Sequence, residues 1–264
     1  MNWYFYKVWV PLHILMVLSL VFIFTGHVDV NWWVVLFSWF LVGPIGIGVG
    51  FHRLFSHRQF QTWRPVEITL AILGTLSTYS PLLFWVGTHQ THHRLADSNK
   101  DIQSPSHHTF WESFMMWKLR NGLEKTFSLR DYCTRQCLRD SLLVSIDKYT
   151  VIIIWSWALI LLAISPSVLI SVFVVPAFIE HARVNLTNYV GHKSNIPFNY
   201  RNSNSDDSSQ NNLLLGWLGF GMGWHNNHHT DERELVNTHN WWEIDVEGQI
   251  ARLIATKQSK TNEK

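Results

Sequence analysis

The sequence is poor in charge and in cysteine. Charged residues make up 15% of its 264 residues, and the formal net charge at pH 7 is +2. That charge is too small to indicate nucleic-acid binding, and no basic stripe interleaved with aromatic residues occurs. The two cysteines, Cys133 and Cys137, lie about one helical turn apart in a polar segment. We expect reduced thiols, because this pair provides neither a disulfide framework nor a zinc-ligand spacing.

Several redox motifs are absent as well. The sequence contains no Glu-x-x-His pair, which soluble di-iron proteins use to bind their metals. It also lacks a Cys-x-x-Cys motif, a dinucleotide-binding fingerprint and a cytochrome domain. These absences exclude a soluble di-iron enzyme of the carboxylate type. Any redox reaction would therefore draw its electrons from a separate protein.

Apolar residues make up 47% of the sequence, and they gather into long runs. About 20 apolar residues cross a hydrocarbon core of roughly 30 Å. The first run lacks a small-residue cleavage pattern, so we expect it to remain as a membrane span. We predict four spans, at residues 8–25, 32–51, 150–164 and 168–190.

The distribution of Lys and Arg predicts how these spans are oriented. The turns at 26–31 and 165–167 carry neither residue, whereas the polar segment 94–148 carries many. By the positive-inside rule, the two turns face away from the cytoplasm. We therefore predict a multi-pass integral membrane protein with both termini on the cytoplasmic side.

Fifteen histidines are the most distinctive polar feature, and eight of them fall into three short clusters, the histidine boxes. The boxes are His52 and His57; His89, His92 and His93; and His225, His228 and His229. In the second and third boxes the spacing i, i+3, i+4 lies on one face of a helical turn, so we expect the three imidazoles of each box to converge on one point. The total exceeds what one ion needs and predicts a two-metal site. Imidazole binds iron, zinc, copper and nickel alike, so the ligands alone do not choose the metal.

The first box has a different spacing. His52 and His57 are five residues apart, which on a continuous helix points them about 140° away from each other. Either the helix breaks between them, or they bind different metals. The glycines at 43–50 beside this box either let neighbouring backbones approach closely or provide ordinary small-residue packing.

The remaining histidines need separate interpretations. On the projecting end of the last span, Asn188 and His192 lie at i and i+4, which fits a further ligand pair or a helix-capping role equally well. The other six are expected to be ordinary hydrogen-bonded residues: His13, His27, His107, His108, His181 and His239.

The segment 66–85 separates the first two boxes. If it crossed the membrane, those boxes would lie on opposite sides and could not share a site, so we expect an interfacial or re-entrant helix. The predicted fold class is an all-α integral membrane protein with about four transmembrane helices, an interfacial helix and a cytoplasmic helical cap. We assign one domain to residues 1–256 and a polar tail to 257–264.

The three boxes resemble those of the membrane-bound fatty acyl desaturases of the delta-9 type. The matching stretches are 50–58, 89–93 and 223–229, in the same order and spacing. The similarity runs from about residue 8 to 254 and includes weaker pieces: Asp101 with Ser104 and Pro105, Phe110 with Trp111, Trp117, Asp206 to Ser208, and Trp241 to Glu243. Three boxes in register among membrane spans are a specific signal.

The resemblance implies a fold and a reaction. It implies four spans with a cytoplasmic cap, a tunnel for an acyl chain, and two irons held by nine histidines. In that family, an Asn-x-x-x-His pair on the fourth span supplies one metal ligand directly and one through water. The same form occurs here in Asn188-Tyr189-Val190-Gly191-His192. The implied reaction introduces a cis double bond into a saturated acyl chain with O2 as co-substrate and electrons from ferredoxin or cytochrome b5. This sequence departs from the family at Met222, where an acidic residue is common, and at 182–185, which lack the usual Thr-Trp.

The substrate is expected to be a fatty acyl lipid or an acyl-CoA, and the sequence favours the lipid. Where acyl-CoA members of the family carry a basic residue and an Asn, this sequence has Gly87 and the apolar run 81–84. A charged carrier would find few charge-assisted hydrogen bonds there. The alternative is that Arg94, Lys118 or Arg120 supplies the charge from elsewhere.

Two other functions are compatible with clustered histidines. A membrane di-iron hydroxylase or ketolase would share the ligands and would insert oxygen. A metal transporter would place polar ligands near the middle of the bilayer on broken helices. Here every box lies at or beyond the end of a predicted span, which disfavours the transporter.

Overall fold

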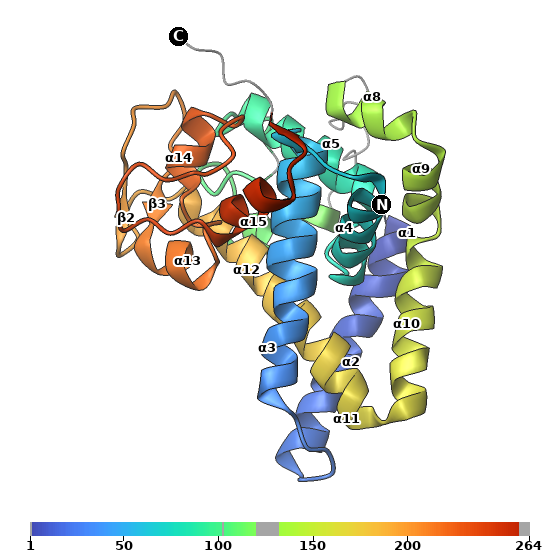
Figure 1. Cartoon of the computed structure of the whole chain (residues 1–264). Helices are drawn as coiled ribbons and strands as arrows, with labels where there is room; N and C mark the ends of the chain where they lie inside the picture. Colours follow the sequence, from blue (N-terminus) through green and yellow to red (C-terminus); the bar gives the residue numbers. More distant parts are fainter. Residues whose placement is uncertain (1, 102, 120–131, 259–264) are drawn as a thin grey trace.

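A computed structural model describes residues 2–101, 103–119 and 132–258. The chain is mostly helical. Long helices gather at one end of the molecule, and short helices, loops and two small sheets form a cap at the other end (Figure 1). The first long helical stretch consists of α1 (Asn2–Tyr4), η1 (Phe5–Trp9) and α2 (Val10–Phe24).

The second and fourth predicted spans are each a continuous helical stretch. The second consists of α3 (Trp32–Phe40) and the π-helix η2 (Leu41–Ser56), and the fourth of α11 (Pro166–Leu169), η4 (Ile170–Val174) and α12 (Val175–Gly191). Asn31 caps α3 by accepting hydrogen bonds from two backbone amides, and Ser165 caps α11 in the same way with one. These caps satisfy amides that lack a partner inside the helix, so they explain where each stretch begins.

Among the described residues, three helical stretches are long and apolar enough to cross a membrane: Phe5–Phe24, Trp32–Ser56 and Pro166–Gly191. The count rises to four if α9 (Ser141–Lys148) and α10 (Thr150–Ile164), bent by 63° at their junction, form one span. Alone, the 15 residues of α10 measure about 22 Å, which is short of the roughly 30 Å core.

The segment 66–85 was expected to form one interfacial or re-entrant helix, and the part of that expectation that made it a single helix is wrong. The chain forms α4 (Arg64–Leu76) and α5 (Leu82–Leu95), separated by a break at 77–81. Thr78 has a positive φ of 61°, and Pro81 lacks the amide hydrogen that a continuing helix needs. At 13 and 14 residues, each helix measures only about 20 Å, too short to cross a bilayer.

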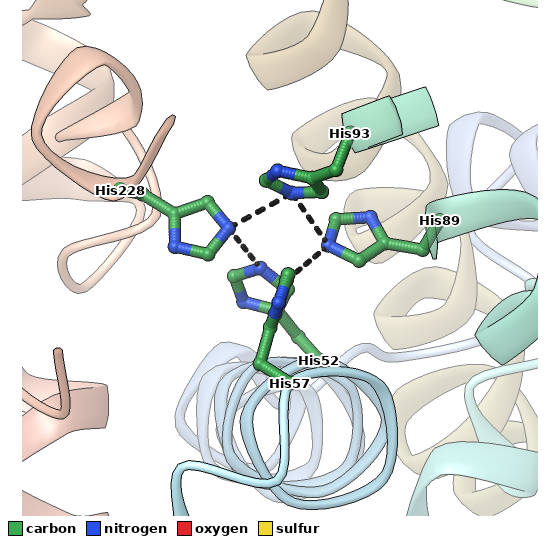
Figure 2. A group of neighbouring side chains, drawn as sticks. All are labelled: His52, His57, His89, His93 and His228. Carbon is green, nitrogen blue, oxygen red and sulfur yellow. Dashed lines mark hydrogen bonds between the residues drawn. The ribbon is translucent and has the colours of Figure 1, made fainter. Parts of the chain in front are cut away.

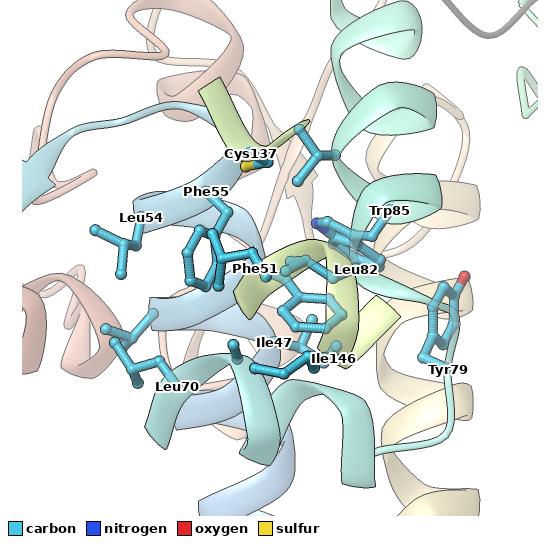
Figure 3. Close-up of a cluster of buried hydrophobic side chains, with 14 of the residues drawn as sticks. Ile47, Phe51, Leu54, Phe55, Leu70, Tyr79, Leu82, Trp85, Cys137 and Ile146 are labelled. Carbon is cyan, nitrogen blue, oxygen red and sulfur yellow. The ribbon is translucent and has the colours of Figure 1, made fainter. Parts of the chain in front are cut away.

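A large apolar cluster joins the helices that carry the first two boxes. Phe51 and Leu54 of η2 pack with Leu70 of α4 and with Leu82 and Trp85 of α5, and α8 (Tyr132–Leu138) and α9 add further side chains (Figure 3). Burying each large apolar side chain contributes roughly 1.5–3 kcal/mol. This cluster therefore holds η2 and α5 in a defined relative position.

The glycines of η2 allow close approach. A Cβ at Gly46 would lie 2.5 Å from the backbone nitrogen of Gly74 in α4, and a Cβ at Gly48 would collide with the Glu247 carboxylate. The contact at Gly46 joins two backbones and leaves no room for a side chain there, whereas Gly48 makes room for the Glu247 side chain. Of the two interpretations, close approach of backbones therefore applies at Gly46.

The cap holds the third box. Its elements are β1 (Phe60–Gln61), α6 (Phe110–Phe114), η3 (Met116–Leu119), β2 (Asn199–Tyr200), β3 (Asn211–Asn212), α13 (Leu213–Leu218), α14 (His225–Thr230), α15 (Val246–Ile254) and β4 (Lys257–Gln258). Strand β2 pairs antiparallel with β3, and β1 with β4. The expected polar tail at 257–264 thus begins inside a strand, and residues 259–264 lie outside the described residues.

Buried ion pairs fasten the cap to the long helices. The Arg53 guanidinium of η2 donates to both carboxylate oxygens of Asp245, at 2.8 and 2.9 Å. In α12, Arg183 donates to Glu180 at 2.8 Å and to Glu247 of α15 at 2.6 Å. Removing one partner of such a pair leaves a buried charge uncompensated, which typically costs about 3–5 kcal/mol.

Candidate metal centre

The first box lies on a π-helix, which decides how its two histidines are arranged. Backbone hydrogen bonds in a π-helix join residues five apart, and the His57 amide donates to the His52 carbonyl at 3.1 Å. The two residues therefore lie about one turn apart on one face, with ring centroids 4.9 Å apart. Neither alternative describes this geometry, since the helix does not break between the two residues and both lie in one group of candidate ligands.

Nine histidines gather into two groups. Group 1 contains His52, His57, His89, His93 and His228, and group 2 contains His92, His192, His225 and His229. In each group the candidate ligand atoms all lie within 4.8 Å of one another. The groups take up all eight box histidines together with His192.

The second and third boxes each divide between the two groups, so the expectation that the imidazoles of one box converge on a single point is wrong. In α5, His89 and His93 face group 1 while His92 faces group 2; in α14, only His228 faces group 1. The reason is helical geometry. At 100° per residue, position i+4 lies about 40° to one side of i, and position i+3 lies about 60° to the other.

Group 1 has the spacing of a ligand set (Figure 2). Neighbouring Nε2 atoms are 2.7 Å apart for His57 and His89, 3.1 Å for His89 and His93, 3.1 Å for His93 and His228, and 2.9 Å for His228 and His52. Two nitrogens bound at right angles about 2.1 Å from a metal would be about 3.0 Å apart. A neutral imidazole offers only one N–H and one lone pair. A cation at the centre of the group therefore satisfies the facing Nε2 atoms better than hydrogen bonds between them do.

Group 2 lies where the last long helix meets the cap. His192, directly after α12, places its Nε2 3.1 Å from that of His92 and 3.0 Å from that of His225. The Nε2 of His229 is buried and has no hydrogen-bond partner in the described part of the chain. A buried, unpartnered lone pair is costly, and a metal ion would satisfy it. The donor sets of both groups therefore fit a metal ion.

Three histidines of group 2 each have a carboxylate close to the Nδ1 atom. Each carboxylate contacts one such atom: Asp101 that of His92 at 3.0 Å, Asp97 that of His192 at 3.2 Å, and Asp207 that of His229 at 2.5 Å. Such a carboxylate holds the proton on Nδ1 and turns Nε2 toward the metal. Asp101 and Asp207 lie in the family-like pieces, but the sequence assigned no role to them and missed Asp97.

Glu232 is the corresponding carboxylate of group 1. One of its oxygens lies 3.4 Å from Nδ1 of His57 and 3.6 Å from Nδ1 of His93. Sequence reasoning missed this residue too, although it follows the third box by only three positions.

The electrostatics of the site favour metal binding at neutral pH. Burial lowers the pKa of His89, His93, His225 and His228 well below the usual value for histidine. These rings are therefore neutral and have a free lone pair, which is the form that binds metal. Burial tends to raise the pKa of Asp207, but the hydrogen bond with His229 outweighs it and holds that pKa below its usual range.

A largely apolar cavity reaches both groups. Its walls include His52 and His89 of group 1 and His92 and His225 of group 2. The remaining lining includes Tyr79, Trp85, Trp117, Val184, Thr187 and Met222. Asn188 also lines the cavity and donates to the Gln103 carbonyl at 3.1 Å.

The six histidines that were expected to be ordinary hydrogen-bonded residues lie outside both groups. His13 contacts the Trp9 carbonyl at 2.8 Å, His107 the Asp97 carbonyl at 2.8 Å and His181 the Thr78 hydroxyl at 3.1 Å. His27 contacts Thr25, His239 lies 4.0 Å from Glu234, and His108 has a partner as well. Cys137 is buried.

Three basic residues were named as alternative sources of positive charge for a charged acyl carrier. Of these, Arg94 is exposed on α5. Arg120 and the side chains of Lys118 and Cys133 lie outside the described residues.

Comparisons with known proteins agree with the geometry. Residues 31–244 match the family model described as fatty acid desaturase. The chain is 32% identical over 233 residues to an sn-1 stearoyl-lipid 9-desaturase of Anabaena variabilis, a match that covers 88% of this chain and 83% of that protein. It is 31% identical to an sn-2 palmitoyl-lipid 9-desaturase of Nostoc sp. (strain 36), over 84% of this chain and 77% of that protein. A hex-5-enoyl-[acyl-carrier protein] acetylenase of Moorena producens is 26% identical, over 80% and 70%.

These matches decide among the functions that the histidines left open. They favour desaturation over hydroxylation, ketone formation or metal transport, and they confirm the resemblance carried by the three boxes. With several helices able to cross a membrane and two histidine groups able to hold metal, the chain belongs to the fatty acid desaturase family and is an oxidoreductase that desaturates fatty acyl chains.

Proposed function

We propose that this desaturase holds one iron ion in each histidine group and uses O2 to introduce a cis double bond at the delta-9 position of an acyl chain carried by a membrane lipid. The ligands are His52, His57, His89, His93 and His228 for one ion and His92, His192, His225 and His229 for the other, with Asn188 joined through a water molecule. When bound, the ions supply the oxidising power that removing hydrogen from an unactivated methylene requires, which no side-chain base has.

The electron balance requires a second protein. Two neighbouring methylene groups each lose one hydrogen, which gives up two electrons and two protons as the double bond forms. Reduction of O2 to two water molecules needs four electrons and four protons. The remaining two electrons come from ferredoxin or cytochrome b5 docked on the cap, and the remaining two protons come from water.

The single observation that carries this proposal is the cavity whose walls include ligands of both histidine groups. Trp85 stacks on His89 with ring centroids 5.7 Å apart, and the Tyr79 hydroxyl donates to Asn185 at 2.7 Å. These side chains fix the shape of an apolar wall beside the metal ligands. Such a wall excludes water and orients an acyl chain, since ligand pockets combine apolar linings with few polar groups.

The lipid carrier is supported by two observations. The first two relatives named above are lipid desaturases by name, and Gly87 gives α5 no basic side chain just before the second box. The acetylenase is named for a chain on acyl-carrier protein, so membership of the family alone does not fix the carrier.

The proposed topology has four spans, the fourth formed by α9 with α10, and a cap, active site and termini on the cytoplasmic side. It is supported by the lack of Lys and Arg in the turns 26–31 and 165–167. The short helices α4 and α5 return the chain to the same end of the molecule as η2, as a shared site requires.

The test has two parts. A host that expresses the chain should gain a cis-monounsaturated fatty acid, and a hydroxylated or keto product would contradict desaturation. Reconstituted enzyme with a reducing donor should then receive labelled stearoyl chains as a glycerolipid, as the CoA thioester or on acyl-carrier protein. We expect the glycerolipid to react fastest; faster reaction of either free thioester, without prior transfer to lipid, would overturn the lipid carrier and leave desaturation intact.

A further inference from the structure

The carboxylates behind the two histidine groups are unequally distributed. In group 2, three of the four histidines each have their own aspartate, and the side chains of Asp101, Asp97 and Asp207 are only 1%, 14% and 12% exposed. In group 1, the only carboxylate of the described residues that contacts an Nδ1 atom is that of Glu232, which faces both His57 and His93 and whose side chain is 51% exposed. The two groups therefore differ in how firmly their ligands are held.

The rest of group 1 strengthens the contrast. The Nδ1 atoms of His52 and His228 are buried and have no hydrogen-bond partner in the described part of the chain. A ring without such a partner is fixed only by packing, whereas a carboxylate on Nδ1 fixes both the tautomer and the orientation of the ring. The partners of group 1 are also further away, at 3.4 and 3.6 Å against 2.5–3.2 Å in group 2.

Burial decides how much each carboxylate contributes to holding a cation. The attraction between two opposite charges at a given distance is several times stronger at a partly buried site than in bulk water, because water screens it. Three shielded carboxylates therefore stabilise a cation in group 2 more than one half-exposed carboxylate does in group 1. Group 1 has one more imidazole, but imidazoles are neutral and add no negative charge.

We propose that the two metal positions are inequivalent: the ion of group 1 is the exchangeable one, and Glu232 is the solvent-facing positioning residue that controls its retention. This inference rests on the proposed function, because it requires that both groups hold ions. Glu232 acts through His57 and His93 and does not itself contact the metal. Its half-exposed carboxylate marks the place where group 1 lies closest to bulk water, so metal is loaded and lost there.

The experiment follows metal release from the full-length chain in detergent. Wild-type protein is loaded anaerobically with iron-57 as Fe(II) and is then exposed to a water-soluble chelator, and iron per chain is measured over time. We expect two phases of about one ion each. In Glu232→Gln the fast phase should accelerate by roughly 10- to 100-fold, the usual effect of losing an outer partner of a metal ligand, while the slow phase stays unchanged.

Two further variants make the comparison specific. Glu234→Gln alters a carboxylate two residues away that lies 4.0 Å from His239, outside both groups, and it should release iron as the wild type does. Asp207→Asn removes the carboxylate behind His229 and should accelerate the slow phase instead. Mössbauer spectra of the loaded proteins give a readout independent of activity, since Glu232→Gln should change one of two iron signals and leave the other in place.

The outcomes separate this inference from the proposed function. Release of both ions at one rate, with Glu232→Gln unchanged, would overturn the inequivalence and leave a two-iron enzyme. Equal acceleration of both phases would show a general structural role for Glu232 and would also overturn it. Wild-type protein that binds no iron in either group would instead overturn the proposed function itself.

Discussion

Each histidine of the two groups has its role decided by the atoms around its ring. His92 and His93 are neighbours in sequence, yet they face different groups and have different carboxylates at their Nδ1 atoms, Asp101 and Glu232. Adjacent residues on a helix point about 100° apart, so two neighbouring imidazoles are suited to two ions and not to one. Substitution of a single histidine should therefore affect one metal position at a time.

The first prediction compares His228→Ala, which removes a ligand of group 1, with His92→Ala, which removes one of group 2. We expect each variant to retain about one iron per chain in place of two and to lose desaturation, while insertion into the membrane is unchanged because lipid burial holds the spans. His27→Ala, in an exposed turn outside both groups, is the matched control and should keep both ions. Full iron content and full activity in either ligand variant would contradict the assignment.

The second prediction concerns a buried carboxyl at the junction of cap and spans. Burial raises the pKa of Glu247 to about 7, against the opposing effect of Arg183, which also holds Glu180. One guanidinium only partly compensates two buried carboxylates, so Glu247 exchanges between its charged and protonated forms near neutral pH. A carboxyl whose pKa is raised by folding stabilises the fold at low pH, and this contribution is lost as the pH rises through 7.

Glu247→Gln keeps a hydrogen-bond acceptor for Arg183 and removes the titration. Between pH 5 and pH 8 we expect the thermal midpoint of the wild type to fall by a few degrees relative to that of Glu247→Gln. Asp29→Asn, an exposed carboxylate in the turn between the first two spans, is the control and should track the wild type. Parallel pH profiles for all three proteins would show that Glu247 is ionised throughout this range.

At the scale of elements, contact between η2 and α4 sets the position of the first box. The two helices touch through Gly46 and Gly74, and Phe51 packs against the Gly74 position. This contact leads directly into His52 and His57 at the end of the same helix. A change in the separation of these helices would therefore move two ligands of group 1.

The third prediction is that Gly46→Val destabilises the protein and lowers the occupancy of group 1 first. A Cβ at this position would lie 2.5–2.6 Å from backbone atoms of Leu73 and Gly74, so the helices must separate. Overpacking of this kind typically costs about 1–3 kcal/mol and sometimes more. Thermal unfolding in detergent and iron content provide the measurements. Leu36→Val, on an exposed face of α3, should change stability by less than about 0.5 kcal/mol, and equal effects of the two substitutions would contradict a special role for this contact.

At the scale of the whole molecule, the boxes come from segments far apart in the chain and meet at one end of it. Figure 1 shows α5 and α14 near the cap end of the α3–η2 stretch, while the turn before α3 lies at the opposite end. This arrangement agrees with a site at one membrane surface and with short helices α4 and α5 that do not cross. It also makes sidedness testable from positions that are distant from the metal ligands.

The fourth prediction uses single cysteines in a background with Cys133 and Cys137 replaced by Ser. Cysteines at Asp29 and Ser167 should react with a membrane-impermeant maleimide from outside the cytoplasm, because the turns that carry them lack Lys and Arg. Cysteines at Gln61 and Lys100 should react only after the cytoplasmic face is opened. Labelling of Gln61 and Lys100 from opposite sides would show that α4 and α5 together cross the membrane.

The sequence by itself determined the chemistry and the outline of the architecture. Imidazole ligands are recognisable because their residue type and short spacing are local properties, and the apolar runs at 8–25, 32–51 and 168–190 match helices able to cross a membrane. From spacing alone, His192 could have a ligand role or a helix-capping role. The resemblance to a family then favoured the ligand role. Local patterns are informative here because helix periodicity and hydrophobic length depend on neighbouring residues alone.

Only the tertiary structure decided how the ligands divide. The π-helical backbone of η2 places His52 and His57 on one face, whereas the expected α-helical geometry separated them. The break at 77–81 turns one expected helix into two and brings α5 back beside η2. Glu232 contacts His57 and His93, which lie 175 and 139 positions before it in the chain. These features depend on the packing of helices that are distant in sequence, and no local pattern specifies the relative positions of such helices.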